Sequence, residues 1–145
     1  MNFSVDSNIL VNLSNTSSPF YLKTETAISM LLANRDRLFI FPQNLVEFWA
    51  VSTRPILSNG LGFSIIQAEN EIIRIRRLFH LSDETSAIYP EWQRLVSAHK
   101  VSGKNVHDTR IVAQMNVHGI VNLLTFNTKD FSRYTNINSV EPTSV

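Results

Sequence analysis

Five side chains whose oxygens could bind a metal ion either follow apolar runs or stand near the start of helical patterns. Asp6 directly follows a short alternating segment, and Asn127 and Asp130 come just after the clearest apolar run near the C-terminus. Glu47 and Asp108 stand near the start of two helical patterns, where the positive end of the helix dipole stabilises an anion. Because ligands gather at the carboxyl ends of parallel strands, we expect these five positions to converge on one edge of a sheet.

Such a set of carboxylates is typical of a magnesium or manganese site. Both ions are hard cations that prefer oxygen ligands and retain several waters, so a few acids around a cleft are sufficient to bind them. Such ions lower the pKa of a bound water, neutralise a scissile phosphate and, when paired about 4 Å apart, stabilise the entering and leaving oxygens. The acids therefore favour metal-dependent phosphodiester chemistry.

Apolar residues alternate between strand and helix spacing along the chain. Short apolar or alternating runs predict strands at residues 3–5, 38–41, 79–81, 120–126 and 137–140. Helical spacing, with Ser64 as a cap, Pro90 in a first turn and Gly119 as a terminator, predicts helices at about residues 9–13, 21–34, 43–53, 65–78, 90–99 and 108–118. The chain shows no internal repeat and no linker, so residues 1–145 are expected to form one domain.

This alternation determines the predicted fold class. Strands that alternate with helices favour an α/β fold with a mostly parallel sheet of four or five strands, covered on both faces. Each acid would then lie just after a strand or near the start of a helix.

Four segments resemble the PIN-domain family, and especially the VapC-type toxins of bacterial toxin–antitoxin pairs. In chain order they are Val5–Leu10, Asn44–Trp49, Val106–Ala113 and Leu124–Phe131. Each segment alone is weakly specific, but together they span nearly the whole chain in the family order. The resemblance implies a three-layer α/β/α sandwich and metal-dependent cleavage of RNA, with Mg²⁺ or Mn²⁺ as cofactor.

The resemblance also assigns roles to the acids. It implies that Asp6, Glu47 and Asp108 are the metal ligands and, with Asp130 as the candidate fourth acid, the catalytic set. The sequence departs from the family at Asn127, an amide where many relatives have a carboxylate. Other positions are expected to orient waters or substrate, namely Ser7, Thr125 and Asn127, or to contact the RNA backbone, namely Lys100, Lys104, Arg110 and Lys129.

Composition restricts the remaining possibilities. The absence of cysteine excludes disulfides and thiolate metal sites and, with no signal-like start, fits the cytoplasm. The net charge of +1 gives no global attraction to phosphates, so RNA affinity must come from a local patch or a metal. No apolar run is long enough for a membrane span. Phe48, Trp49 and Trp92 are interpreted as core or subunit contacts rather than base-stacking residues.

The leading hypothesis is an endoribonuclease toxin of the VapC type, inhibited by a separate antitoxin that covers the acidic cleft, and forming a homodimer through its early helices. Two alternatives stay open. One is a PIN-fold RNA-processing nuclease without a toxin role. The other is a catalytically silent module that binds RNA or protein, which the amide at Asn127 favours.

Overall fold

Five short strands form one parallel sheet in the order β3-β2-β1-β4-β5 in the computed structural model, which describes residues 1–145. The strands are β1 (Asn2–Val5), β2 (Arg37–Ile40), β3 (His80–Leu81), β4 (Asn122–Leu124) and β5 (Asn138–Val140). All four neighbouring pairs are parallel, and Ser4 of the central β1 pairs with Phe39 on one side and Leu123 on the other. The prediction of a parallel sheet with four or five strands is confirmed.

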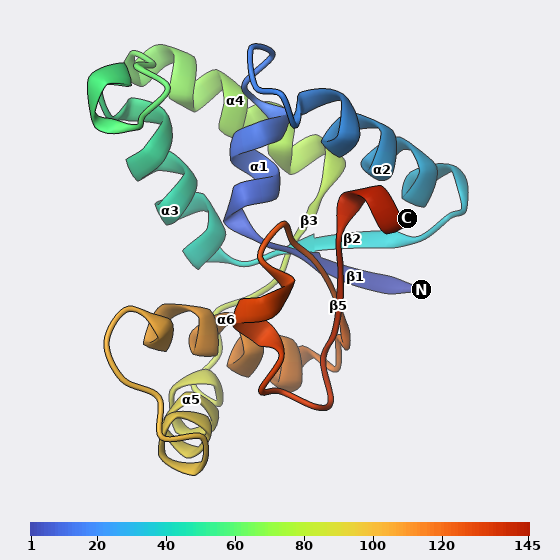
Figure 1. Cartoon of the computed structure of the whole chain (residues 1–145), viewed down its shortest axis with the longest axis vertical. Helices are drawn as coiled ribbons and strands as arrows, with labels where there is room; N and C mark the ends of the chain where they lie inside the picture. Colours follow the sequence, from blue (N-terminus) through green and yellow to red (C-terminus); the bar gives the residue numbers. More distant parts are fainter.

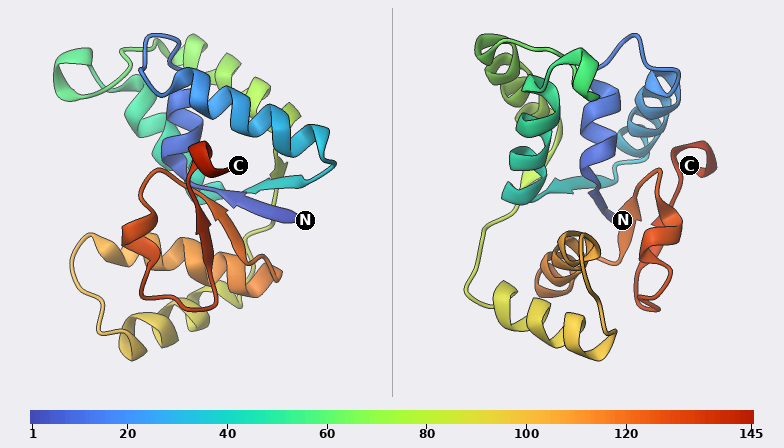
Figure 2. Two further views of the ribbon diagram at one scale, coloured as in Figure 1. Left: turned by 45° about the vertical axis from the view of Figure 1, so that its right-hand side comes forward. Right: turned by 60° about the vertical axis from the view of Figure 1, so that its left-hand side comes forward.

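Helices cover both faces of this sheet (Figure 1). One face carries α1 (Ser7–Leu13), α2 (Tyr21–Ala33), α3 (Pro42–Thr53) and α4 (Ile65–Leu78), and the other carries α5 (Ile88–Ala98) and α6 (Asn105–His118). Short 3₁₀ turns complete the chain at η1 (Ile56–Ser58), η2 (Thr128–Phe131) and η3 (Pro142–Ser144). Figure 2 shows the three layers from two further directions. None of the six α-helices has the length and apolar character needed to cross a membrane.

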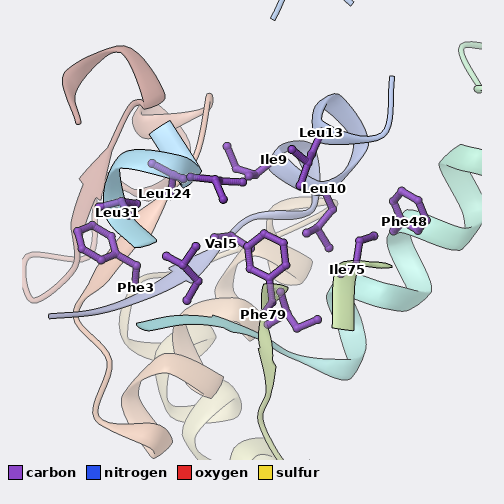
Figure 3. Packing of buried hydrophobic residues seen from close by; sticks show 13 residues of the cluster. Phe3, Val5, Ile9, Leu10, Leu13, Leu31, Phe48, Ile75, Phe79 and Leu124 are labelled. Carbon is purple, nitrogen blue, oxygen red and sulfur yellow. The ribbon is translucent and has the colours of Figure 1, made fainter. Parts of the chain in front are cut away.

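The two faces of the sheet bury separate apolar clusters. The first cluster joins β1 to α1–α4 through residues such as Val5, Leu10 and Phe48, all fully buried (Figure 3). The second joins α5 and α6 to the opposite face, with Leu123 and Met115 fully buried. Because successive side chains of a strand point to opposite faces, Leu123 packs into the second cluster and its neighbour Leu124 into the first.

Local capping fixes where α3 begins. Asn44 accepts a hydrogen bond from the Phe41 backbone N–H through its Oδ1 at 2.8 Å, and Pro42 provides the first helical residue. Glu47 is therefore held in the second turn of α3, close to the carboxyl end of β2. Helix α6 ends at His118 and is followed by Gly119, whose φ of 68° lies in the left-handed region that favours glycine.

Several predicted elements differ from those observed. Strand β4 spans three residues rather than the seven of 120–126, since its partners β1 and β5 pair with it only there. Helix α6 begins at Asn105, three residues before Asp108, and α5 begins two residues before Pro90. The helical spacing of Ile65, Ala68 and Ile75 also predicts one buried face for α4, but Ile65 is 54% exposed, whereas Ala68 and Ile75 are buried.

Candidate active site

The acidic residues lie around the carboxyl edge of the central strands. Asp6 directly follows β1 and caps the N-terminus of α1, while Thr125 directly follows β4, the neighbour of β1 in the sheet. Glu47 lies in the second turn of α3, and Asp108 in the first turn of α6. These two helices cover opposite faces of the sheet, so the acids approach the edge from both layers.

Hydrogen bonds hold the Asp6 carboxylate in a single orientation. Its Oδ1 accepts from the Ser7 backbone N–H at 2.7 Å, and its Oδ2 accepts from the Thr125 hydroxyl at 2.8 Å. The Asn8 amide lies 3.4 Å from the same Oδ2. Because the carboxylate is only 8% exposed, burial is the main cause that raises the pKa of Asp6 above its usual value.

Ser7 connects Asp6 to Glu47. Its hydroxyl donates to Glu47 Oε2 at 2.7 Å and accepts from the Asn44 amide nitrogen at 3.2 Å. Ser7 and Thr125 each donate a hydroxyl hydrogen bond to one candidate acid, whereas their predicted role in orienting water or substrate stays a prediction. Asn44, which the sequence did not single out, both caps α3 and orients this hydroxyl.

Gln43 holds the second oxygen of Glu47. Its amide nitrogen donates to Glu47 Oε1 at 2.7 Å and to the backbone oxygen of His107 at 2.9 Å. Its own oxygen accepts from Arg110 at 3.2 Å and from Gln114 at 2.7 Å. Gln43 therefore links α3 to α6 across the candidate site. Sequence reasoning missed this residue, although its position one helical turn before Glu47 was a usable signal.

Asp108 and Asp130 differ from the other two acids because no group in the chain donates a hydrogen bond to either carboxylate. Asp108 is half-buried, whereas Asp130 is exposed at η2. Burial, followed by the charges of Asp6, Asp130 and Glu47, raises the pKa of Asp108 to about 6. The other three acids are thus close enough to Asp108 to destabilise its ionised form.

This donor set has the chemistry that a hard cation requires. Carboxylate oxygens are its preferred ligands, and Asp108 is a half-buried charge without a hydrogen-bond donor to compensate it. No three acidic or histidine side chains are already spaced to hold an ion between them. A direct three-acid ligand set therefore stays a prediction, while one or two carboxylates completed by water are compatible with Mg²⁺.

The predicted RNA contacts fall into two groups. Lys100, Lys104 and Lys129 are exposed and form no ion pair within the chain. Arg110 instead pairs with Glu84 and hydrogen-bonds Gln43, so part of its guanidinium is already engaged within the protein.

The exposed side chain of Asn127 makes no hydrogen bond, and only its backbone N–H contacts the site, donating to the Thr125 hydroxyl at 3.0 Å.

The raised pKa of Asp108 predicts that Asp108→Asn stabilises the metal-free protein at neutral pH. A carboxyl with a folded-state pKa near 6 binds protons more tightly than the unfolded chain does, so its contribution to stability falls as pH rises from about 4 to 7. The shift corresponds to about 3 kcal/mol, which solvent screening of a half-exposed group reduces to about 1 kcal/mol. Urea unfolding in chelator should give Asp108→Asn a higher free energy of unfolding than the parent at pH 7.5 and a much smaller difference at pH 4.5. An equal difference at the two pH values would contradict a raised pKa of Asp108.

Comparisons with known proteins agree with the observed fold. No family model matches the chain. Ribonuclease VapC48 from Mycobacterium tuberculosis is 26% identical over 145 residues, covering 99% of each protein. VapBC2 from Rickettsia felis, solved with a DNA fragment from its promoter, superposes with a TM-score of 0.72 at 18% identity over 97% of this chain and 98% of that one. A toxin–antitoxin complex from Klebsiella pneumoniae gives a TM-score of 0.66 at 21% identity over 98% of both chains.

These relatives share the whole architecture rather than a single motif, since the matches cover nearly the full length of both chains. The predicted three-layer α/β/α fold is confirmed, and so is the resemblance to VapC-type PIN domains.

Proposed function

We propose that this chain is a PIN-domain endoribonuclease of the VapC type, the toxin of a toxin–antitoxin pair, which cleaves RNA with Mg²⁺ or Mn²⁺ in the cytoplasm. The observation that carries the proposal is a half-buried Asp108 that has no hydrogen-bond donor and lies near the charges of Asp6, Asp130 and Glu47 at one edge of the sheet. The named ribonuclease that matches the full chain supports the same activity.

Asp6, Glu47 and Asp108 would hold the metal, with Asp130 as the fourth acid of the catalytic set. When bound, the ion supplies Lewis-acid activation of the attacking water and neutralises the charge of the scissile phosphate. Divalent charge at this point would also relieve the repulsion that raises the pKa of Asp108. Proton release on metal binding is therefore expected from this site.

The residues around the acids have a positioning role. Ser7 and Thr125 would hold the Glu47 and Asp6 carboxylates in fixed orientations, so that little reorganisation is needed when charge develops on the phosphate. The exposed lysines Lys104 and Lys129 flank Asp108 and Asp130 in sequence and would contact the RNA backbone. Their charge provides the local attraction that a net charge of +1 does not.

A cleavage assay with purified protein tests the proposal. Single-stranded and structured RNAs should be cut in Mn²⁺ or Mg²⁺, left intact in excess chelator, and cut again when the metal is restored. Full cleavage in chelator by protein shown to be metal-free would overturn the metal-dependent mechanism. Metal-independent binding of RNA without cleavage would instead support the silent module that the amide at Asn127 favours.

The toxin role rests on partners that the related complexes contain. An apolar surface groove between α3 and α4 is lined by Leu45, Val46, Trp49 and Ile72, and the antitoxin would cover it together with the acidic site. Exposed early-helix residues such as Leu22 would contact a second copy. Induced expression should arrest growth, and co-expression of the product of the neighbouring gene should restore it. Cleavage without growth arrest would favour the RNA-processing alternative.

Substitution of Gln43 by Ala tests how much the link between α3 and α6 contributes to the proposed activity. Loss of its bond to Glu47 Oε1 frees the carboxylate to rotate, and small misplacements of catalytic groups cost up to about 10²-fold in rate. We expect kcat to fall by about tenfold to hundredfold with KM nearly unchanged. Gln93→Ala, on the exposed face of α5, is the matched control and should retain full activity. A variant with unchanged kcat would show that Gln43 does not position Glu47.

A further inference from the structure

A cavity of about 270 Å³ opens between α5 and the start of α6. Its lining consists of Tyr89, Trp92, Val106, His107 and Arg110. His107 and Arg110 lie on α6 within two residues of Asp108. Gln43, which also bonds Glu47, donates a hydrogen bond to the His107 backbone oxygen. The cavity therefore lies at the helix segment that carries Asp108, although none of its lining residues is a carboxylate.

Two aromatic rings form the apolar wall of this cavity. The Tyr89 and Trp92 ring centroids lie 5.8 Å apart with 33° between the ring planes. The indole of Trp92 is held in place because its Nε1 donates to the Val106 backbone oxygen at 2.9 Å. Tyr89 is 64% exposed, which is unusual for a large aromatic ring that contributes only to packing. The interpretation of Trp92 as a core or subunit contact is therefore incomplete, since it also lines a surface cavity.

The remaining lining groups are planar and nitrogen-rich. The exposed His107 imidazole offers ring nitrogens, and the Arg110 guanidinium is fixed by Glu84 and by Gln43. A pre-positioned guanidinium is suited to stacking on an aromatic ligand or to donating hydrogen bonds to its edge. The cavity thus combines aromatic faces with polar groups at a rim next to the site of phosphate cleavage.

We propose that this cavity binds one unstacked base of the RNA substrate, next to the phosphate that is cut. The inference rests on the proposed function, because RNA is the ligand that brings a base and a phosphate together. Sequence-specific proteins bind single-stranded RNA by stacking extruded bases on aromatic rings or arginine planes and by hydrogen-bonding the base edges. Tyr89 and Trp92 provide the stacking surface, and His107 and Arg110 select the base.

Tryptophan fluorescence measures this binding without any catalytic step. The chain has two tryptophans, so Trp49→Phe leaves Trp92 as the sole reporter. In chelator, single-stranded RNA decamers of A, C or U should quench the fluorescence of Trp92. An abasic ribose-phosphate decamer of equal charge should leave this fluorescence unchanged. Tyr89→Ala in the same background should weaken binding of at least one decamer about tenfold to hundredfold, the usual effect of removing one stacking ring. Tyr89→Phe keeps the ring and should bind normally.

The outcomes separate this proposal from the nuclease proposal. Equal quenching by normal and abasic decamers, or unchanged binding by Tyr89→Ala, overturns the base site even if the parent protein cleaves RNA. Base-dependent quenching of Trp92 fluorescence by a protein that never cleaves RNA supports the base site and contradicts the proposed nuclease function. Because Tyr89 is mostly exposed, Tyr89→Ala should unfold at the same urea concentration as the parent, which excludes a general loss of structure.

Discussion

Asp6→Asn is expected to reduce kcat/KM for RNA cleavage by about 10³-fold, since a metal ligand supplies several kcal/mol of transition-state stabilisation. Asn has nearly the same shape, so its oxygen can still accept from the Ser7 backbone or the Thr125 hydroxyl. The substitution mainly removes negative charge. Because burial already disfavours the ionised form of Asp6, the metal-free variant should be no less stable than the parent.

Asp83→Asn makes the same chemical change at an exposed position outside the site and should retain full activity. Cleavage rates at saturating Mn²⁺ and urea unfolding curves in chelator should be measured for both variants. Cleavage by Asp6→Asn at the parental rate would show that the Asp6 carboxylate is not needed for RNA cleavage. Loss of activity together with a large loss of stability would mean that Asp6 is needed for folding rather than for metal binding.

Phe48→Ala is expected to lower the free energy of unfolding by about 3–5 kcal/mol. Phe48 is fully buried in the first apolar cluster, where Figure 3 shows it on the helix beside Leu10 and Ile75. Removing the ring leaves a cavity between α3 and its neighbours, which the packed surroundings fill only in part. As Phe48 directly follows Glu47, its packing also holds α3 against the sheet at the active site.

Val46→Ala lies on the same helix, but its side chain is 69% exposed, so its effect should stay within about 0.5 kcal/mol. Urea denaturation of both variants in chelator separates core packing from metal binding. A loss below about 1 kcal/mol for Phe48→Ala would show that α3 is not anchored through this ring.

The sequence was informative wherever a local pattern determined the structure. Asp6 follows β1 as predicted, since a short alternating segment ending in an acid has few other interpretations. The parallel order followed from strands that alternate with helices. The strand 120–126 was predicted too long, because apolar character continues past the three residues that find partners on both sides. Pairing length depends on other strands, which a local pattern does not contain.

The network around the acids was beyond sequence reasoning for a related reason. Gln43 contacts Arg110 and Gln114, which lie 67 and 71 residues further along the chain, so only the folded structure shows that it links α3 to α6. Arg110 was predicted as an RNA contact from its position near Asp108, yet Glu84 and Gln43 already bind part of its guanidinium. Charge in a sequence indicates where a cation is, but not which partner within the chain neutralises it.

Anomalous diffraction from crystals soaked in Mn²⁺ tests most directly whether the acids share a cation. We expect an anomalous peak at the carboxyl edge of β1, at about 2.0–2.3 Å from oxygens of both Asp6 and Asp108, and no such peak in Asp6→Asn crystals. A fully occupied ion bound elsewhere, with this edge empty at millimolar Mn²⁺, would contradict the shared metal site and the nuclease mechanism built on it.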